Sequence, residues 1–343
     1  KSEGKIMINK LTVGTRGSRL AIIQTEIVVT ALRKKFPFID FNVITIKTKG
    51  DIDNRPIFTI DRKGVFEKEI NEAVIKNTID FAVHSLKDIP SDLSDIITVA
   101  SIPKRSKPND VLVSHKKIKL KQLRPGAVVG TSSLRRAIQL TRLRPDLDVR
   151  PIRGNVETRI GKTVSGDYDA IILAEAGLLR LGLKDQIVER FAIKDFIPAP
   201  GQGSIAVVCR TDNQELIELL KKIEDPQSRT EIDVERALLK QIGGGCRFPV
   251  GALAVTRSSR YKSNKIRTSN NTKTNPKTQE PRNIHLYASI FSADGSKCIK
   301  LRERGRAKDA KKLGVNMGKL LIKGGALDLA KGWRDAVQQW NRK

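Results

Sequence analysis

Of the three cysteines in this sequence, Cys246 lies where the backbone is least encumbered, in the glycine-rich stretch IGGGCRFPVG. An open, electropositive loop lowers the pKa of a thiol and favours the nucleophilic thiolate. A cysteine that acts as a recycling nucleophile needs a nearby base, whereas a covalent anchor does not, and no histidine is close to Cys246 in the sequence. Two interpretations stay open, an attachment site and an incidental loop thiol.

Arginines follow several predicted strands at the point where each strand ends. Arg16 in TRGSRL, Arg135 and Arg136 in TSSLRRA, and Arg153 in RGNVETR occupy such places. Ligands of open α/β sheets bind at strand ends, and guanidinium groups suit carboxylates. Positive side chains in the first turn of a helix oppose its dipole, which is tolerable if an anion sits there. The pattern favours an anion-binding cleft; surface arginines on an amphipathic helix are the alternative.

A carboxylate stands close to these arginines in the predicted arrangement. Asp88 in HSLKD follows directly on the apolar strand FAV. A carboxylate at the end of a strand can stabilise a cation or move a proton. An ordinary salt bridge in a loop is the simpler interpretation, and His84 could equally be a hydrogen-bonded structural residue.

The charge of the chain limits the class of partner. Its 343 residues carry 65 basic and 37 acidic side chains, a net charge of +28, which favours anionic partners. Aromatic residues make up 4%, so stacking platforms for nucleic-acid bases would be scarce. A small polyanionic substrate competes with nucleic acid as the explanation, and a solvated basic surface explains most of the lysines.

The cysteines and histidines indicate the compartment and argue against a metal site. The three cysteines form no C-x-x-C pair, and the three histidines are isolated. We therefore expect a reduced, cytoplasmic protein without a bound metal. No stretch of about 18 apolar residues predicts a membrane span. Residues 1–6 are either an extension before Met7 or the remnant of a transit peptide.

Strands and helices alternate along most of the chain, which is typical of a mainly parallel sheet with covered faces. The predicted strands are 11–15, 41–48, 80–85, 126–131, 147–154 and 168–177, with helices after Ser18 and Ser133. FIPAPGQGSIAVVCR then brings prolines and glycines ahead of a further strand, and this punctuation predicts a crossover or hinge.

The character of the sequence changes near Asp225. Val234, Leu238 and Ile242 define a helix face, and Gly243 is a plausible terminator. Two alternating strands, 283–291 and 297–302, are joined by a turn at Asp294-Gly295. The polar, basic stretch 257–282 before them predicts a disordered insertion.

Seven ordered motifs resemble the hydroxymethylbilane synthase (porphobilinogen deaminase) family. They are TRGSRLAIIQ, KGVFEKEI, HSLKDIPSDL, GTSSLRRAIQL, IRGNVETR, PGQGSIAV and GGGCRFPVG. The resemblance implies an α/β fold of three domains, in which two domains like the halves of periplasmic binding proteins flank a cleft and a smaller α+β domain ends the chain. The implied ranges are 7–103 with 202–221, 104–201, and 222–343 with its insertion.

The resemblance also implies a reaction of tetrapyrrole and haem biosynthesis. A transferase of this family deaminates four porphobilinogen molecules, joins them head to tail on a dipyrromethane primer and releases hydroxymethylbilane with water. Cys246 matches the cysteine that holds the primer by a thioether, and Asp88 matches the catalytic aspartate. Each pyrrole carries an acetate and a propionate, which explains an arginine-lined cleft.

Further residues match family positions. The implied cofactor contacts are Lys63, Lys87, Thr131, Ser133, Arg135 and Arg136. The implied substrate contacts are Arg16, Ser18, Arg153, Arg159, Arg180 and Gln202. The chain departs from many relatives at Thr59, where they have a lysine that contacts the cofactor, so one anchoring charge differs.

A second hypothesis is a non-catalytic anion- or nucleic-acid-binding protein that uses the basic surface. The net charge of +28 and the basic insertion motivate it. The resemblance favours the enzyme, acting as a monomer on porphobilinogen with no required nucleic acid and no membrane.

Overall fold

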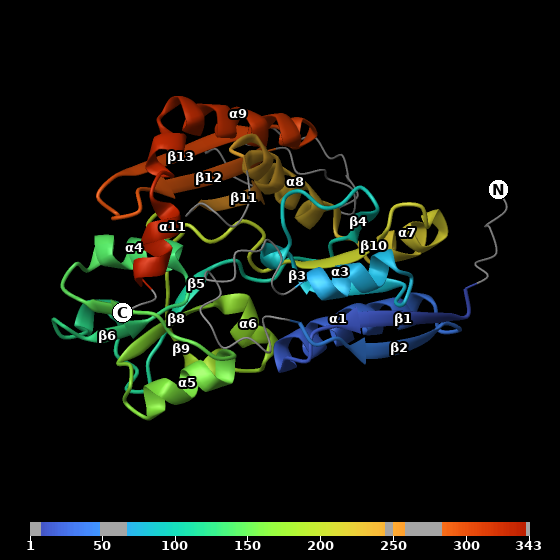
Figure 1. Cartoon of the computed structure of the whole chain (residues 1–343), viewed down its shortest axis with the longest axis horizontal. Coiled ribbons are helices and arrows are strands. Elements are labelled where there is room, and N and C mark those ends of the chain that lie inside the picture. The colour runs from blue at the N-terminus through green and yellow to red at the C-terminus, as the bar shows by residue number, and fades with distance from the viewer. Residues whose placement is uncertain (1–7, 49–66, 244–249, 258–282, 341–343) are drawn as a thin grey trace, which may run out of the picture.

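Three β-sheets organise the protein, as the computed structural model in Figure 1 shows. The structure describes residues 8–48, 67–243, 250–257 and 283–340. Lys63, Cys246 and all but the first residue of the predicted insertion 257–282 lie outside these ranges, and Arg257 is the last residue of a strand. None of the helices in the described ranges is long and apolar enough to cross a membrane.

The first sheet has the strand order β2-β1-β3-β10-β4. β1 pairs in parallel with β2 and β3, while β10 is antiparallel to both β3 and β4. We call this sheet with its helices the first lobe. Its elements are β1 (Lys10–Thr15), α1 (Arg19–Lys35), β2 (Asp40–Thr45), α3 (Lys68–Ile75), β3 (Phe81–Ser85), β4 (Ile97–Ser101), β10 (Ile205–Arg210) and α7 (Gln214–Lys221).

The second sheet repeats this arrangement with the order β7-β6-β8-β5-β9. β6 pairs in parallel with β7 and β8, and β5 is antiparallel to both β8 and β9. We call this part the second lobe. Its elements are β5 (Asp110–Val113), β6 (Val128–Gly130), α4 (Leu134–Leu143), β7 (Asp148–Arg150), α5 (Val156–Val164), β8 (Ala170–Ala174), α6 (Glu175–Arg180) and β9 (Ile187–Arg190).

Two chain segments join the lobes. The chain leaves the first lobe after β4 through residues 102–109 and returns through 191–204 to supply β10. Gly201 and Gly203 in the return segment have φ values of +76° and +91°. A Cβ on Gly203 would lie 2.8 Å from the Ser106 carbonyl oxygen of the outgoing segment. The predicted crossover is confirmed, and its glycines let the two segments approach closely.

A smaller antiparallel sheet, β11-β12-β13, carries helices on one face, so the predicted α/β class with a smaller C-terminal unit is confirmed. Val234, Leu238 and Ile242 are buried on one face of α8, and Gly243 follows with φ +79°. α8 and α9 pack against each other (Figure 1). The elements are α8 (Pro226–Gln241), β11 (Gly251–Arg257), β12 (Asn283–Phe291), β13 (Cys298–Gly305), α9 (Ala310–Lys323), α10 (Ala326–Leu329) and α11 (Trp333–Trp340).

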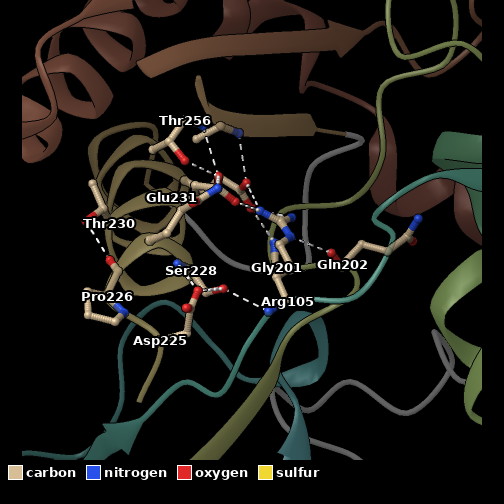
Figure 2. A network of polar contacts seen from close by, with 12 residues as sticks. Arg105, Gly201, Gln202, Asp225, Pro226, Ser228, Thr230, Glu231 and Thr256 are labelled. Carbon is tan, nitrogen blue, oxygen red and sulfur yellow. Dashed lines mark hydrogen bonds and ion pairs between the residues drawn. The ribbon is translucent and has the colours of Figure 1, made fainter. Parts of the chain in front are cut away.

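A buried ion pair connects the two interlobe segments to the smaller C-terminal unit (Figure 2). Arg105 in the outgoing segment donates to both carboxylate oxygens of Glu235 on α8, at 2.6 and 3.3 Å. Glu235 also accepts from the amides of Gly201 at 2.6 Å and Ala254 at 2.8 Å. Burial raises the pKa of Glu235, and Arg105 and the two amides oppose that rise. One carboxylate thus binds both interlobe segments and β11.

Replacing Glu235 with Gln should destabilise the protein strongly, because Arg105 keeps its buried charge and loses the nearer of its two carboxylate partners, while Glu231 remains at 3.7 Å. Removing one member of a buried pair costs about 3–5 kcal/mol, so urea unfolding should show a fall of that size. Glu218→Gln is the matched control, because Glu218 and Lys221 form an exposed ion pair, and the loss of such a pair changes stability little. Equal losses in the two variants would contradict the assigned role of Glu235.

Candidate active site

A cleft of about 760 Å³ lies between the two lobes. Nine of the predicted site residues line it, which places side chains from distant parts of the sequence around one space. They are Arg16, Ser18, Lys87, Asp88, Arg136, Arg153, Arg159, Arg180 and Gln202.

The turn after β1 supplies one wall of the cleft. Arg16 follows the strand directly, and Ser18 caps α1 by accepting a hydrogen bond from the Ala21 amide at 3.3 Å. A capped helix start presents unpaired N–H groups and the positive end of the helix dipole. The local sequence TRGSRL therefore directs both an arginine and a helix N-terminus at the cleft.

A short 3-10 turn, Leu86–Asp88, follows β3 and holds Lys87 and Asp88 at the cleft. Behind it, the Gln24 side chain from α1 exchanges hydrogen bonds with the Ser85 hydroxyl at 3.0 and 3.1 Å. These contacts fix the end of β3 against α1. Asp88, the predicted catalytic residue, therefore follows a strand end that is held in place by hydrogen bonds. Sequence reasoning missed Gln24 and Ser85, whose side chains carry no distinctive motif.

The second lobe presents its arginines from the facing wall. Arg153 follows β7, and Arg159 lies on α5, where its Nε donates to the Gly154 carbonyl at 2.7 Å. Arg180 ends α6 and donates to the Gly203 carbonyl at 2.7 Å. Arg153 and Arg159 come from the chain that follows a strand, as the sequence pattern predicts, whereas Arg180 was expected only from the family resemblance.

Asp110 pairs with both arginines of α4 and balances one of their two charges. Its carboxylate contacts Arg135 at 2.9 Å and Arg136 at 2.7 Å, and it accepts from the Gln202 amide at 2.9 Å. Burial raises the pKa of Asp110, but the two guanidinium groups outweigh this and hold it below its usual value. The sequence predicts an anion at the start of α4. In the structure, the Asp110 carboxylate of the protein itself contacts these arginines.

Arg135 and Arg136 differ in direction. Arg135 donates to the Ile197 carbonyl at 2.7 Å and is not among the cleft-lining residues, whereas Arg136 reaches Gln202 at 3.3 Å and lines the cleft. Thr131 and Ser133 are likewise not among the lining residues; Ser133 caps α4. The cofactor contacts of Thr131, Ser133 and Arg135 stay predictions.

The cleft is strongly cationic. Its described lining holds eight lysines and arginines against the three carboxylates Glu67, Asp88 and Glu157. Burial, and then Arg136 and Arg153, lower the pKa of Arg159 to about 10, and burial alone lowers that of Arg180 to about 10. Both groups stay charged at neutral pH. Unbalanced buried charges of one sign favour an anionic occupant.

The site fits the anionic pyrrole pair that the sequence motifs imply. The volume lies within the range of small-molecule pockets, and the excess of cations suits a ligand with several carboxylates. Arg16, Lys87, Arg136 and Arg153 lie at the wall in positions to hold such groups. Lys63 and Cys246, together with Thr59, fall outside the described residues.

Two family descriptions match the chain over most of its length. "Porphobilinogen deaminase, dipyromethane cofactor binding domain" covers residues 11–218, and "Porphobilinogen deaminase, C-terminal domain" covers 229–323. The chain belongs to the porphobilinogen deaminase family. It is therefore a transferase of tetrapyrrole biosynthesis that uses a dipyrromethane cofactor.

Curated relatives extend over nearly the whole chain. The "Probable porphobilinogen deaminase" of Nitrosopumilus maritimus is 47% identical over 97% of this chain and 99% of its own length. The porphobilinogen deaminase of Roseiflexus castenholzii is 42% identical over 95% and 100%. A solved structure of the methionine binding protein MetQ is 13% identical, covers 62% of this chain and 90% of its own, and has a TM-score of 0.40. The family descriptions and the curated relatives give no support to the hypothesis of a non-catalytic anion- or nucleic-acid-binding protein.

The sequence left open that His84 is a hydrogen-bonded structural residue, but in the structure one of its ring nitrogens has no partner among the described residues. His84 is 6% exposed and lines the cleft, and the nitrogen concerned is its Nε2 atom. Burial, and secondly the charge of Arg16, lower the pKa of His84 from 6.5 to about 4. The imidazole is therefore uncharged at neutral pH, where the arginines of the cleft are charged and can bind anions.

His84 should make the folded protein sensitive to mild acid. Between pH 6.5 and pH 4 the unfolded chain binds a proton that folded His84 does not, so stability falls as the pH falls through this window. The His84 share of the loss between pH 7 and pH 5 is about 2 kcal/mol. Urea unfolding of His84→Gln should show a smaller loss over this interval by that amount, and an identical loss would contradict the buried neutral state.

Proposed function

We propose that the chain joins four porphobilinogen molecules in this interlobe cleft, starting from a dipyrromethane held by Cys246, and then releases hydroxymethylbilane by hydrolysis. The family supports the reaction. The single observation that supports this location is that Asp88 shares one cleft with arginines of both lobes. A reaction that builds up carboxylates and passes through a cationic pyrrole needs both kinds of group.

Binding of the pyrrole carboxylates is assigned to the arginines. Arg16 and Ser18 would hold acetate and propionate groups from the first lobe, and Arg153, Arg159 and Arg180 from the second. An Arg–carboxylate pair can form two parallel hydrogen bonds, which fixes the plane and position of the ligand as well as its charge. Residues on both lobes then orient the reacting carbon atoms toward each other.

Asp88 is assigned the chemical step. When the aminomethyl C–N bond of porphobilinogen breaks, ammonia leaves and positive charge spreads over the pyrrole to its ring nitrogen. The Asp88 carboxylate stabilises this charge from the end of β3. A new C–C bond forms at the free position of the neighbouring pyrrole, and the proton lost there is taken up by a base, a second role for Asp88. When bound, the dipyrromethane supplies the first pyrrole that is extended.

Lys87 and Gln202 would support these groups. Burial lowers the pKa of Lys87, and the neighbouring Asp88 opposes that change. The Gln202 amide donates to the Pro108 carbonyl at 2.7 Å as well as to Asp110. Gln202 would thereby keep Arg136 and the interlobe segments in register, while Lys87 contacts a carboxylate of the cofactor.

Attachment of the cofactor at Cys246 is supported by the residues on either side of it. Gly243 ends α8, and β11 begins at Gly251, where an added Cβ would lie 2.8 Å from the Ile197 carbonyl oxygen. The Ala252 amide donates to the Pro198 carbonyl at 3.0 Å. The start of β11, which follows Cys246 in the chain, therefore lies against the return segment between the lobes.

We further propose three domains, at 7–103 with 202–221, at 104–201 and at 222–343, in a cytoplasmic monomer. The first sheet draws β10 from the second segment of its range, and the other two sheets each come from one continuous range. The small number of cysteines supports a reduced compartment.

Cys246→Ser should remove the covalent cofactor. The intact mass of the wild-type protein should exceed the sequence mass by one dipyrromethane, whereas the variant should have the sequence mass. Cys298→Ser is the control, because Cys298 is a half-buried free cysteine in the described part of the chain and should leave the adduct in place. An adduct that persists on Cys246→Ser, or an unmodified wild type from a host that makes porphobilinogen, would sink the assignment.

Asp88→Asn should lower the rate of hydroxymethylbilane release by about 10²–10⁴-fold, the usual contribution of a positioned acid or base. The asparagine keeps the shape of the side chain and removes its charge, so the unfolding midpoint should change little. Asp95→Asn, an exposed loop position outside the cleft lining, is the matched control. Near-normal turnover by Asp88→Asn would show that Asp88 does not carry the step.

A further inference from the structure

An ion pair that the sequence did not predict crosses the cleft from one lobe to the other. Arg19, the first residue of α1, contacts Glu157 in the first turn of α5, with Nη1 and Oε1 3.5 Å apart. Both residues line the cleft. The side chains are 65% and 33% exposed, so the pair lies toward solvent rather than in the interior.

The place of Arg19 in its own helix points to a role outside that helix. A cation in the first turn opposes the helix dipole, and α1 has no acidic residue in its first turn to offset it. Arg16, also positive, lines the cleft close by in the chain. Glu157 is in the opposite situation, since an anion in the first turn of α5 is favourable and Arg153 and Arg159 flank it in the sequence. The Glu157 carboxylate across the cleft thus offsets the unfavourable interaction of Arg19 with the dipole of its own helix.

An apolar contact lies beside the ion pair. Leu20 follows Arg19 on α1, and its Cδ2 atom is 3.6 Å from the position that a Cβ on Gly177 of α6 would take. α1 and α6 are in contact, as their neighbouring positions in Figure 1 also show. The ion pair is therefore formed beside a direct contact between the two lobes.

We propose that Arg19 and Glu157 form a latch that holds the lobes closed and so positions Arg16 and Ser18 opposite Arg153 and Arg159. The role of both residues is positioning, and it rests on the proposed function of the cleft arginines in binding carboxylates. An exposed pair changes the closed-to-open ratio by at most about fivefold, the equivalent of about 1 kcal/mol. A latch of this strength favours closure and still opens for entry of porphobilinogen and exit of product.

The direction of the effect on KM separates a latch from simple electrostatics. Glu157→Gln makes the cleft more positive, so a pure charge effect would lower KM for porphobilinogen, whereas Arg19→Gln would raise it. A latch predicts that both substitutions raise KM by about two- to fivefold with kcat unchanged. The double variant should match either single variant, because each removes the same interaction. A lower KM in Glu157→Gln, or effects that multiply in the double variant, would overturn the proposal.

Hydrogen–deuterium exchange tests the latch without relying on turnover. Arg19→Gln should increase exchange at the start of α5, and Glu157→Gln at the start of α1, since each substitution loosens the opposite lobe. Glu218→Gln on α7 breaks an exposed ion pair within one helix and should change neither. An unchanged opposite lobe in both variants would overturn the latch, whereas a wild type without hydroxymethylbilane synthesis would overturn the proposed function alone.

Discussion

The buried carboxylate of Glu235 is the constraint on which the arrangement of the lobes depends. It binds Arg105 in the outgoing interlobe segment, the Gly201 amide in the return segment and the Ala254 amide in β11. A buried charge without partners costs several kcal/mol, so these three parts of the chain are held at one point. The two interlobe segments are thereby fixed to each other and to the smaller C-terminal unit, and the cleft between the lobes keeps its walls opposed.

A second buried carboxylate, Asp110, divides the arginines of the site into two classes. Arg135 and Arg136 carry a counter-charge of the protein itself, and Arg135 is directed at the Ile197 carbonyl. Arg159 and Arg180 are partly buried and donate to the backbone carbonyls of Gly154 and Gly203. The excess positive charge of the cleft lining is carried by both lobes, by Arg16 and Lys87 on one wall and by Arg153 and Arg159 on the other.

The sequence was informative wherever a local pattern determines the outcome. Strand ends followed by arginines, the crossover in FIPAPGQGS and the buried face of α8 could all be predicted, because each depends on residues that are near one another in the chain. The shared partner of Arg135 and Arg136 could not be predicted, because Asp110 lies on β5, far from α4 in the sequence. The role of Glu235 could not be predicted either, because its partners Arg105, Gly201 and Ala254 are distant from it in the sequence. The state of His84 depends on burial and Arg16, which the motif HSLKD does not encode by itself.

The account rests on one claim, that carboxylates of a cofactor tethered at Cys246 are held by arginines of both lobes with Asp88 at the reacting pyrrole. A crystal structure of the cofactor-loaded protein with porphobilinogen tests it most directly. We predict the pyrrole carboxylates within hydrogen-bond distance of Arg16, Arg153 and Arg159, and the Asp88 carboxylate facing a pyrrole nitrogen. A cofactor that lies outside the interlobe cleft, or carboxylates bound without these arginines, would contradict the account.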